Sequence, residues 1–349
     1  MGSAGVSPGK PVQAADEQHT RLETKLKREL GETILALLTH ERTEDVLLNP
    51  DSSLWVKRRG EGFMRVGEMP ATQAMSALST IAAWRGTVLN HSNPILETEL
   101  PIDGSRFEGI VPPVVRQPVF AIRLRPKTVF TLEDYEAGGI LTTKHDPANA
   151  RRLREDFAAA VRGRSHADVI RAAVLARKNI LVVGSTGSGK TTLVNALLHG
   201  LSILTPHDRV ISIEDTTELQ CPVRNYLDMR AVGNVSMLDC LRACMRLKPT
   251  RIVVGEVRGA EAHTLLKAWN TGHPGGAATV HADDALKGLI RFESLVAEAT
   301  NAPQQQLIAE AVDLVIFVDE EPSVKAGRKV REVLLVHGHR EGRYEVEPV

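Results

Sequence analysis

The first third of the chain shows one helical stretch followed by short β-type runs. From Leu22 to Leu38, leucine and isoleucine recur every three or four residues among charges, which predicts a helix with one apolar face. Packing on the protein's own core is the usual reason for such a face. Docking on a membrane surface or on a partner protein is the alternative. Residues 1–20 are small and polar with Gly and Pro, and we expect a flexible tail there.

The β-type runs are separated by turn residues and by a second helical stretch at 72–85. Asp103-Gly104 favours a tight hairpin between two of them. The runs lie at 45–48, 54–58, 63–66, 95–100, 106–111 and 119–125. We therefore predict an α+β N-terminal domain with an antiparallel sheet over residues 21–130.

The pattern changes after residue 130. Thr131-Leu-Glu-Asp134 has the form of a helix capping box, and Gly and Pro residues then indicate a linker over 131–150. Beyond it, uninterrupted apolar runs alternate with helical stretches, which is typical of a parallel sheet covered on both faces. These runs lie at 180–183, 210–213, 252–254, 277–280 and 314–318. We predict an α/β domain over residues 151–349.

The composition is that of a globular protein with a core, since 42% of the 349 residues are hydrophobic and 25% are charged. Disorder is excluded because it needs low hydrophobicity and high net charge. The 43 basic residues balance 43 acidic ones, and only 4% are aromatic, so we expect no direct sequence-specific nucleic-acid binding.

Targeting signals are weak. Three cysteines fit a reducing compartment, and Cys240 and Cys244 lack the further ligands of a zinc site. The first residues lack the apolar core of a signal peptide, and no apolar stretch reaches the ~18 residues that span a membrane. We therefore expect a cytoplasmic protein whose membrane contact, if any, is peripheral.

A phosphate-binding loop is the strongest motif. It matches G-x-x-x-x-G-K-[ST] between an apolar run and a helical stretch, and its residues are Gly184, Ser185, Thr186, Gly187, Ser188, Gly189, Lys190 and Thr191. Its glycines let backbone N–H groups converge on phosphates at a helix N-terminus, and Thr192 joins the binding candidates. Lys190 would bridge the β- and γ-phosphates, and the Thr191 hydroxyl would bind Mg²⁺. ATP and Mg²⁺ are therefore the predicted ligands.

Two later apolar runs end in acids, where ligands bind in open α/β sheets. One leads into Glu214-Asp215-Thr-Thr-Glu218 and the other into Gly255-Glu256. Glu256 has the place of a Walker B acid and would hold Mg²⁺ through water, while the first group could orient or deprotonate attacking water. Solvated turn acids are the plainer alternative, but their place after a phosphate loop favours catalysis.

Two histidines flank the run at 277–280. His281, directly after it, would lie beside the nucleotide and could report hydrolysis to neighbouring elements. His273, before the run, is the second candidate, although a lone histidine is more often an ordinary satisfied polar residue.

Together these motifs resemble the type II/IV secretion ATPase superfamily. They are similar to its Walker A, Asp box, Walker B and His box, in that order, at 184–191, 213–218, 255–261 and 271–281. The resemblance covers about residues 44–318. It is closest to the conjugative-transfer branch, the TrbB-like traffic ATPases of type IV secretion, which the segment beginning Glu44-Asp-Val-Leu-Leu-Asn-Pro also resembles.

The resemblance implies a RecA-like ATPase domain and a homohexameric ring at the cytoplasmic face of the inner membrane. There it would power conjugative pilus assembly or DNA–protein transfer, with other secretion proteins as partners. It also implies Glu218 as general base, Glu256 as Walker B acid, and Arg106 and Arg123, with Arg125 as a further candidate, as phosphate contacts from the first domain. Ordinary surface arginines on strands are the alternative.

Other functions remain open. The chain has no four-cysteine zinc module and no additional long N-terminal domain, which separates it from many type II secretion and pilus-assembly ATPases, but a pilus retraction motor stays an alternative. Two further alternatives are a DNA-stimulated RecA-like motor and a scaffold that binds ATP only to order a ring. ATPase rates with and without single-stranded DNA separate these classes.

Overall fold

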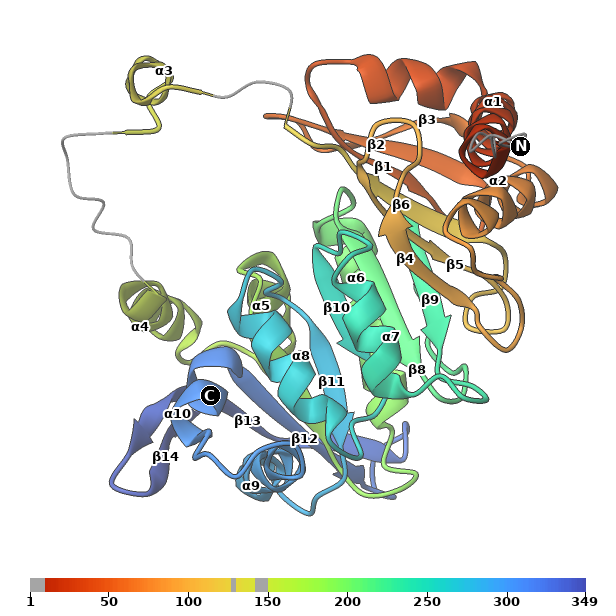
Figure 1. Ribbon diagram of the computed structural model, residues 1–349. Coiled ribbons are helices and arrows are strands. Elements are labelled where there is room, and N and C mark those ends of the chain that lie inside the picture. Colours follow the sequence, from red (N-terminus) through yellow and green to blue (C-terminus); the bar gives the residue numbers. More distant parts are fainter. Residues whose placement is uncertain (1–9, 127–129, 142–149) are drawn as a thin grey trace, which may run out of the picture. The chain divides into compact units, whose positions relative to one another are not determined.

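The computed structural model describes residues 10–126, 130–141 and 150–349 (Figure 1). The chain divides into two compact units, Met1–Lys127 and Thr128–Val349. We placed the end of the first domain at residue 130 and a linker over 131–150, of which 142–149 lie outside the described residues.

Unit 1 holds a six-stranded antiparallel sheet in the order β3-β2-β1-β6-β5-β4. Its strands are β1 (Thr43–Leu48), β2 (Ser53–Arg58), β3 (Phe63–Glu68), β4 (Ile95–Glu99), β5 (Arg106–Ile110) and β6 (Val119–Arg123). Each predicted run forms a strand, and Asp103-Gly104 lies in the turn between β4 and β5. The antiparallel sheet is therefore confirmed.

Two helices pack on this sheet, α1 (Lys10–Thr39) and α2 (Ala71–Trp84). Leu26, Leu30 and Ile34 of α1 are buried in one core cluster with Leu78 of α2 and the inner face of the sheet. The interpretation of this apolar stripe as a core-packing face is confirmed.

The flexible tail predicted over 1–20 is wrong from Lys10 onward, where α1 begins; residues 1–9 lie outside the described part of the chain. The stretch 10–20 holds Ala, Gln and Glu, which favour helix. The His19 ring lies 4.5 Å from the Trp84 ring of α2, which fixes this end of α1. Gly31, with φ 77° and ψ 167°, then kinks the helix.

Three helices lead into the second sheet: α3 (Leu132–Ala137), α4 (Ala150–Val161) and α5 (His166–Leu175). The predicted capping box is present at α3. The Thr131 hydroxyl accepts a hydrogen bond from Asp134 N, and the Asp134 carboxylate accepts one from Thr131 N.

Unit 2 holds an eight-stranded sheet in the order β14-β13-β12-β7-β11-β10-β8-β9. The strands are β7 (Ile180–Val183), β8 (Arg209–Glu214), β9 (Asn225–Arg230), β10 (Arg251–Val254), β11 (Ala277–Val280), β12 (Leu314–Glu320), β13 (Arg328–Arg340) and β14 (Arg343–Pro348). From β12 to β9 all neighbours are parallel, and β13 and β14 add an antiparallel hairpin.

The predicted parallel sheet is thus confirmed at its centre and corrected at one edge, where the sheet is mixed. β14 has only half-exposed and exposed positions, and β13 begins with exposed charged residues, so neither resembles a buried strand over its whole length. The middle of β13, residues 333–336, is nevertheless a buried apolar run that we overlooked. β9 alternates buried and partly exposed positions and was missed because it lacks an uninterrupted apolar run.

Helices cover both faces of the central strands. They are α6 (Lys190–Leu204), α7 (Met237–Cys244), α8 (Glu261–Asn270), α9 (Ala285–Ala297) and α10 (Gln305–Ala311). Leu197 of α6 shares a core cluster with Val182 of β7, whereas Gly288 of α9 approaches Val183 on the opposite face of that strand.

This topology positions the motifs. β7, β11, β10 and β8 are consecutive neighbours and parallel, so their carboxyl ends lie side by side at one edge. The phosphate loop follows β7, His281 follows β11, Glu256 follows β10 and Glu214 ends β8. Lys190 and His281, 91 positions apart in sequence, are therefore brought to one place.

Candidate active site

The phosphate loop links the end of β7 to the start of α6. Gly187 and Gly189 have φ of 80° and 100°, in the left-handed region that favours glycine. A Cβ at Gly184 would overlap with Ser188 Oγ and with the carbonyl oxygen of Val318. The glycines are thus required by backbone geometry, and the N-cap of α6 has no side-chain acceptor, which leaves its first N–H groups for an anion.

Lys190 is buried at the first position of α6. Its ammonium donates hydrogen bonds to the carbonyl oxygens of Gly184, at 3.0 Å, and Ser185, at 2.8 Å. Burial lowers the pKa of Lys190, and the charge of Glu256 opposes that shift. The amine is therefore held inside the loop, where a phosphate could replace the carbonyls as its partner.

His281 connects Lys190 to Glu256, the acid that we expect at the Walker B position. Its Nδ1 lies 3.2 Å from Lys190 Nζ and its Nε2 lies 2.9 Å from Glu256 Oε1. Because an ammonium can only donate, Nδ1 is the acceptor and the ring proton belongs on Nε2, facing the carboxylate. The predicted candidates Lys190, His281 and Glu256 thus form one hydrogen-bonded chain.

Glu218 contacts the predicted magnesium ligand. Its Oε2 accepts a hydrogen bond of 2.9 Å from the Thr191 hydroxyl. Glu214 Oε1 in turn accepts from Glu218 N and Leu219 N, each at 3.0 Å. Burial raises the pKa of Glu214. The structure therefore gives Glu214 a positioning task, holding the turn that carries Glu218, rather than a place at the phosphates.

Arg258 is a further residue of this site. Its guanidinium pairs with Asp215 Oδ2 at 2.6 Å and with Glu256 Oε2 at 2.8 Å. The hydrogen bond to Glu256 raises the pKa of Arg258. Arg258 thus joins the segment that contains Asp215 to the segment that contains Glu256. Its place two residues after Glu256 is the sequence feature that points to it.

His273 does not lie in this cluster, which corrects our catalytic candidate. It precedes β11, whereas His281 follows it, so the two lie beyond opposite ends of a strand whose four residues span about 13 Å at ~3.3 Å each. His273 Nδ1 contacts the carbonyl oxygen of Pro249, ahead of β10, at 3.0 Å. Within this unit, His273 is a polar residue of the amino edge.

The arginine candidates of unit 1 lie side by side. Arg106 of β5 and Arg123 of β6 are exposed and are direct cross-strand partners, so they share one face of the sheet. Their like charges repel, but each arginine also has an acidic cross-strand partner, Glu99 beside Arg106 and Asp45 beside Arg123. Arg125, the further candidate, instead pairs with Glu99 at 2.9 Å.

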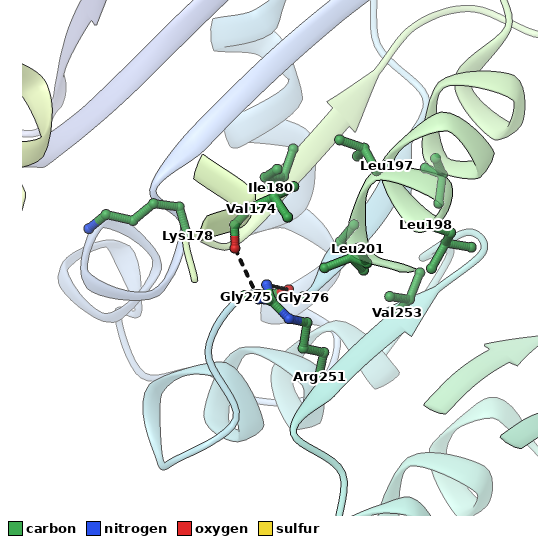
Figure 2. A pocket seen from close by; sticks show the side chains of 12 residues that line it. Val174, Lys178, Ile180, Leu197, Leu198, Leu201, Arg251, Val253, Gly275 and Gly276 are labelled. Carbon is green, nitrogen blue, oxygen red and sulfur yellow. Dashed lines mark hydrogen bonds between the residues drawn. The ribbon is translucent and has the colours of Figure 1, made fainter. Parts of the chain in front are cut away.

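A pocket lies at the other end of the parallel strands (Figure 2). Leu197 and Leu201 of α6 line it, with Gly275, Gly276 and the buried Arg251 (Figure 2). It leaves room for about one water molecule. Arg251 donates to the carbonyl oxygens of Val174, at 2.9 Å, and Gly275, at 3.0 Å, so this pocket belongs to the structural core.

The donor set at the phosphate loop suits Mg²⁺. The Thr191 hydroxyl is hydrogen-bonded to the Glu218 carboxylate, and the Glu256 carboxylate is linked to Lys190 through His281, so all three side chains offer oxygen ligands around the loop. Mg²⁺ is usually held by one or two carboxylates with water and phosphates completing its shell.

In the described part of the chain no helix has both the length and the apolar character to cross a bilayer.

Comparison with known proteins agrees with this geometry. The family described as Type II/IV secretion system protein matches residues 28–331. The probable conjugal transfer protein TrbB of Sinorhizobium fredii (strain NBRC 101917 / NGR234) is 40% identical over 329 residues, 94% of either chain. Conjugal transfer protein TrbB of Rhizobium radiobacter is 39% identical, again over 94% of each. The VirB11 ATPase from the Brucella suis type IV secretion system, solved in complex with sulphate, has a TM-score of 0.83 and 26% identity, over 92% of this chain and 97% of that one.

Proposed function

Because the chain belongs to the type II/IV secretion system protein family and is an ATPase, we propose that it powers conjugative transfer through a type IV secretion system. Its work would be pilus assembly, substrate transfer, or both. The observation that carries the chemical part is the hydrogen-bonded chain Lys190–His281–Glu256 beside the phosphate loop. The relatives named as conjugal transfer proteins support the biological part.

Hydrolysis would use the residues in distinct tasks. The loop N–H groups and Lys190 bind the β- and γ-phosphates. Glu218 orients the attacking water and accepts its proton, since its carboxylate is held at the loop through Thr191. Mg²⁺, when bound near Thr191 and Glu256, supplies charge neutralisation on the phosphates.

Arg258 and Glu214 would keep these groups in place. Glu214 fixes the turn before Glu218, and Arg258 keeps the carboxylates of Asp215 and Glu256 from repelling each other. His281 holds the Glu256 carboxylate. It also contacts Lys190, so its position would depend on whether the Lys190 ammonium is hydrogen-bonded to the loop carbonyls or to a phosphate. The resulting shift of His281 is a route by which nucleotide state reaches neighbouring elements.

Arg106 and Arg123 would take part in coupling ATP hydrolysis to mechanical work. Their shared face on a rigid sheet suits the γ-phosphate end of a nucleotide, which would link unit 1 to the nucleotide state. The family resemblance supports a homohexameric ring of such two-unit chains, peripheral on the cytoplasmic face of the inner membrane, with other secretion proteins as partners.

Steady-state phosphate release tests the chemical proposal. Lys190→Ala should abolish turnover and nucleotide binding, whereas Glu218→Gln should abolish turnover and keep binding, because the loop remains intact. Wild-type rates in either variant would contradict the assignment. Single-stranded DNA should leave the rate unchanged; strong stimulation would favour a DNA motor instead.

A further inference from the structure

The hairpin of β12 and β13 lies against the phosphate loop of the same unit. β12 pairs with β7 up to Phe317 and Val183 and then continues to Glu320, beyond the end of β7. The carbonyl oxygen of Val318 is packed so closely on Gly184 that no Cβ fits there. The hairpin therefore forms one wall of the loop.

Two side chains of this wall reach the loop. Glu320 and Arg328 are direct cross-strand partners, so they share a face. Glu320 Oε1 lies 3.6 Å from the position of a Cβ at Gly187, and Arg328 Cδ lies 2.7 Å from that position at Gly189. The Arg328 guanidinium donates a hydrogen bond of 3.1 Å to Thr192 Oγ1, in the first turn of α6.

The charge of Arg328 does not suit this position in the unliganded protein. The N-terminus of a helix carries partial positive charge and favours anions, whereas cations are favoured at the C-terminus. Lys190 already places one ammonium at the same helix end. Glu320, the cross-strand partner of Arg328, offsets part of the cost of this second cation, and a phosphate between Arg328 and Lys190 would offset more of it.

We propose that Arg328 is a nucleotide-binding residue that contacts the phosphates from the C-terminal hairpin of the same unit. The inference rests on the proposed function of the loop. Thr192 lies beyond Lys190 along α6, and the lysine of such loops serves the β- and γ-phosphates while the backbone cradles the α- and β-phosphates. Arg328 therefore faces the part of the ligand that ADP and ATP share.

The role proposed for Arg328 differs from the role proposed for Arg106 and Arg123. Those two arginines are proposed to act at the γ-phosphate, so their loss should spare ADP. Loss of Arg328 should weaken ADP and a nonhydrolysable ATP analogue equally. A charge-assisted hydrogen bond predicts about a tenfold loss of affinity for each.

The test is calorimetric titration of the full chain with Mg-ADP and with a nonhydrolysable Mg-ATP analogue. Arg328→Ala should bind both about tenfold more weakly, and Arg328→Lys should recover part of the loss. Lys329→Ala is the matched control, because it removes the adjacent positive charge on the opposite face of β13 and should bind as the wild type does.

Thermal melting without nucleotide excludes a purely structural role. Arg328→Ala should melt at or above the wild-type temperature, because the removed cation is unfavourable at the helix N-terminus. A lowered melting temperature with unchanged nucleotide affinity would overturn the inference, as would a loss confined to the triphosphate. No binding by the wild-type chain would instead remove the proposed function itself, and this inference with it.

Discussion

His281 Nε2 donates a hydrogen bond of 2.9 Å to Glu256 Oε1, which joins the carboxyl ends of the neighbouring strands β11 and β10. Removing a side chain that orients a magnesium-binding acid typically costs 10- to 100-fold in activity. We therefore expect His281→Ala to lower kcat by about 30-fold while nucleotide affinity stays within about threefold. Steady-state phosphate release and calorimetry give the two values.

His273→Ala is the matched control for this prediction. It removes the same side chain from the opposite end of β11 and should change kcat by less than about threefold, since His273 contacts only the amino edge here. Equal losses in the two variants would contradict the division between these histidines.

Arg258→Ala should lower kcat by about tenfold. The variant leaves the carboxylates of Asp215 and Glu256 without the guanidinium that bridges them, so Glu256 loses its fixed orientation. Arg258→Lys should recover little, because an ammonium lacks the planar fork that reaches both acids. Arg242→Ala, which removes an exposed arginine 3.9 Å from Asp239, is the control; a similar loss there would point to a general charge effect.

Glu214→Gln should change the pH dependence of stability. Burial raises the pKa of Glu214 above its ordinary value of 4.5, so the folded state holds the proton more tightly than the unfolded state. Stability from this group is thus full below pH 4.5 and is lost as pH rises through the folded pKa. A glutamine keeps the acceptor for Glu218 N and Leu219 N without that loss.

Urea unfolding at several pH values between about 4 and 7 measures this difference. The variant should gain stability relative to the wild type as pH rises. A constant difference between the two chains would mean that Glu214 titrates alike in the folded and unfolded states.

Asp208→Asn should destabilise unit 2 by about 3 kcal/mol, because it removes the charge that faces a buried arginine. Asp208 Oδ2 pairs with Arg251 Nε at 2.6 Å, and the side chains are only 6% and 1% exposed. Burial lowers the pKa of Arg251, while Asp208 opposes this shift. Urea unfolding gives the free energy. Asp168→Asn, in an exposed pair with Arg171, should cost less than about 0.5 kcal/mol.

Much of this fold could be predicted from apolar patterns. Runs such as 180–183 and 252–254 are buried on both faces, so each residue is apolar and the strand is evident. The order of the motifs then placed Lys190, Glu256 and His281 at one edge of the sheet, because parallel strands share their carboxyl ends.

The remainder depends on contacts that leave no local pattern. The start of β13 is exposed and charged and has the pattern of a loop, so nothing in the sequence links Arg328 to Thr192, 136 positions earlier. His273 is a different case, because it became a candidate through the family's His box. Its place before the run at 277–280 was a signal against it, since parallel strands bring only the residue after the run, His281, to the phosphate loop.

The order of the site along the chain has a consequence for synthesis on the ribosome. Lys190 emerges first, then Glu218, Glu256 and His281, and the hairpin that closes the loop emerges last. Since β7 takes its neighbours from strands that are made about 100 and 130 residues later, an incomplete nascent chain has no assembled site. A chain that stops before β11 therefore carries the phosphate loop without either neighbour of the strand that precedes it.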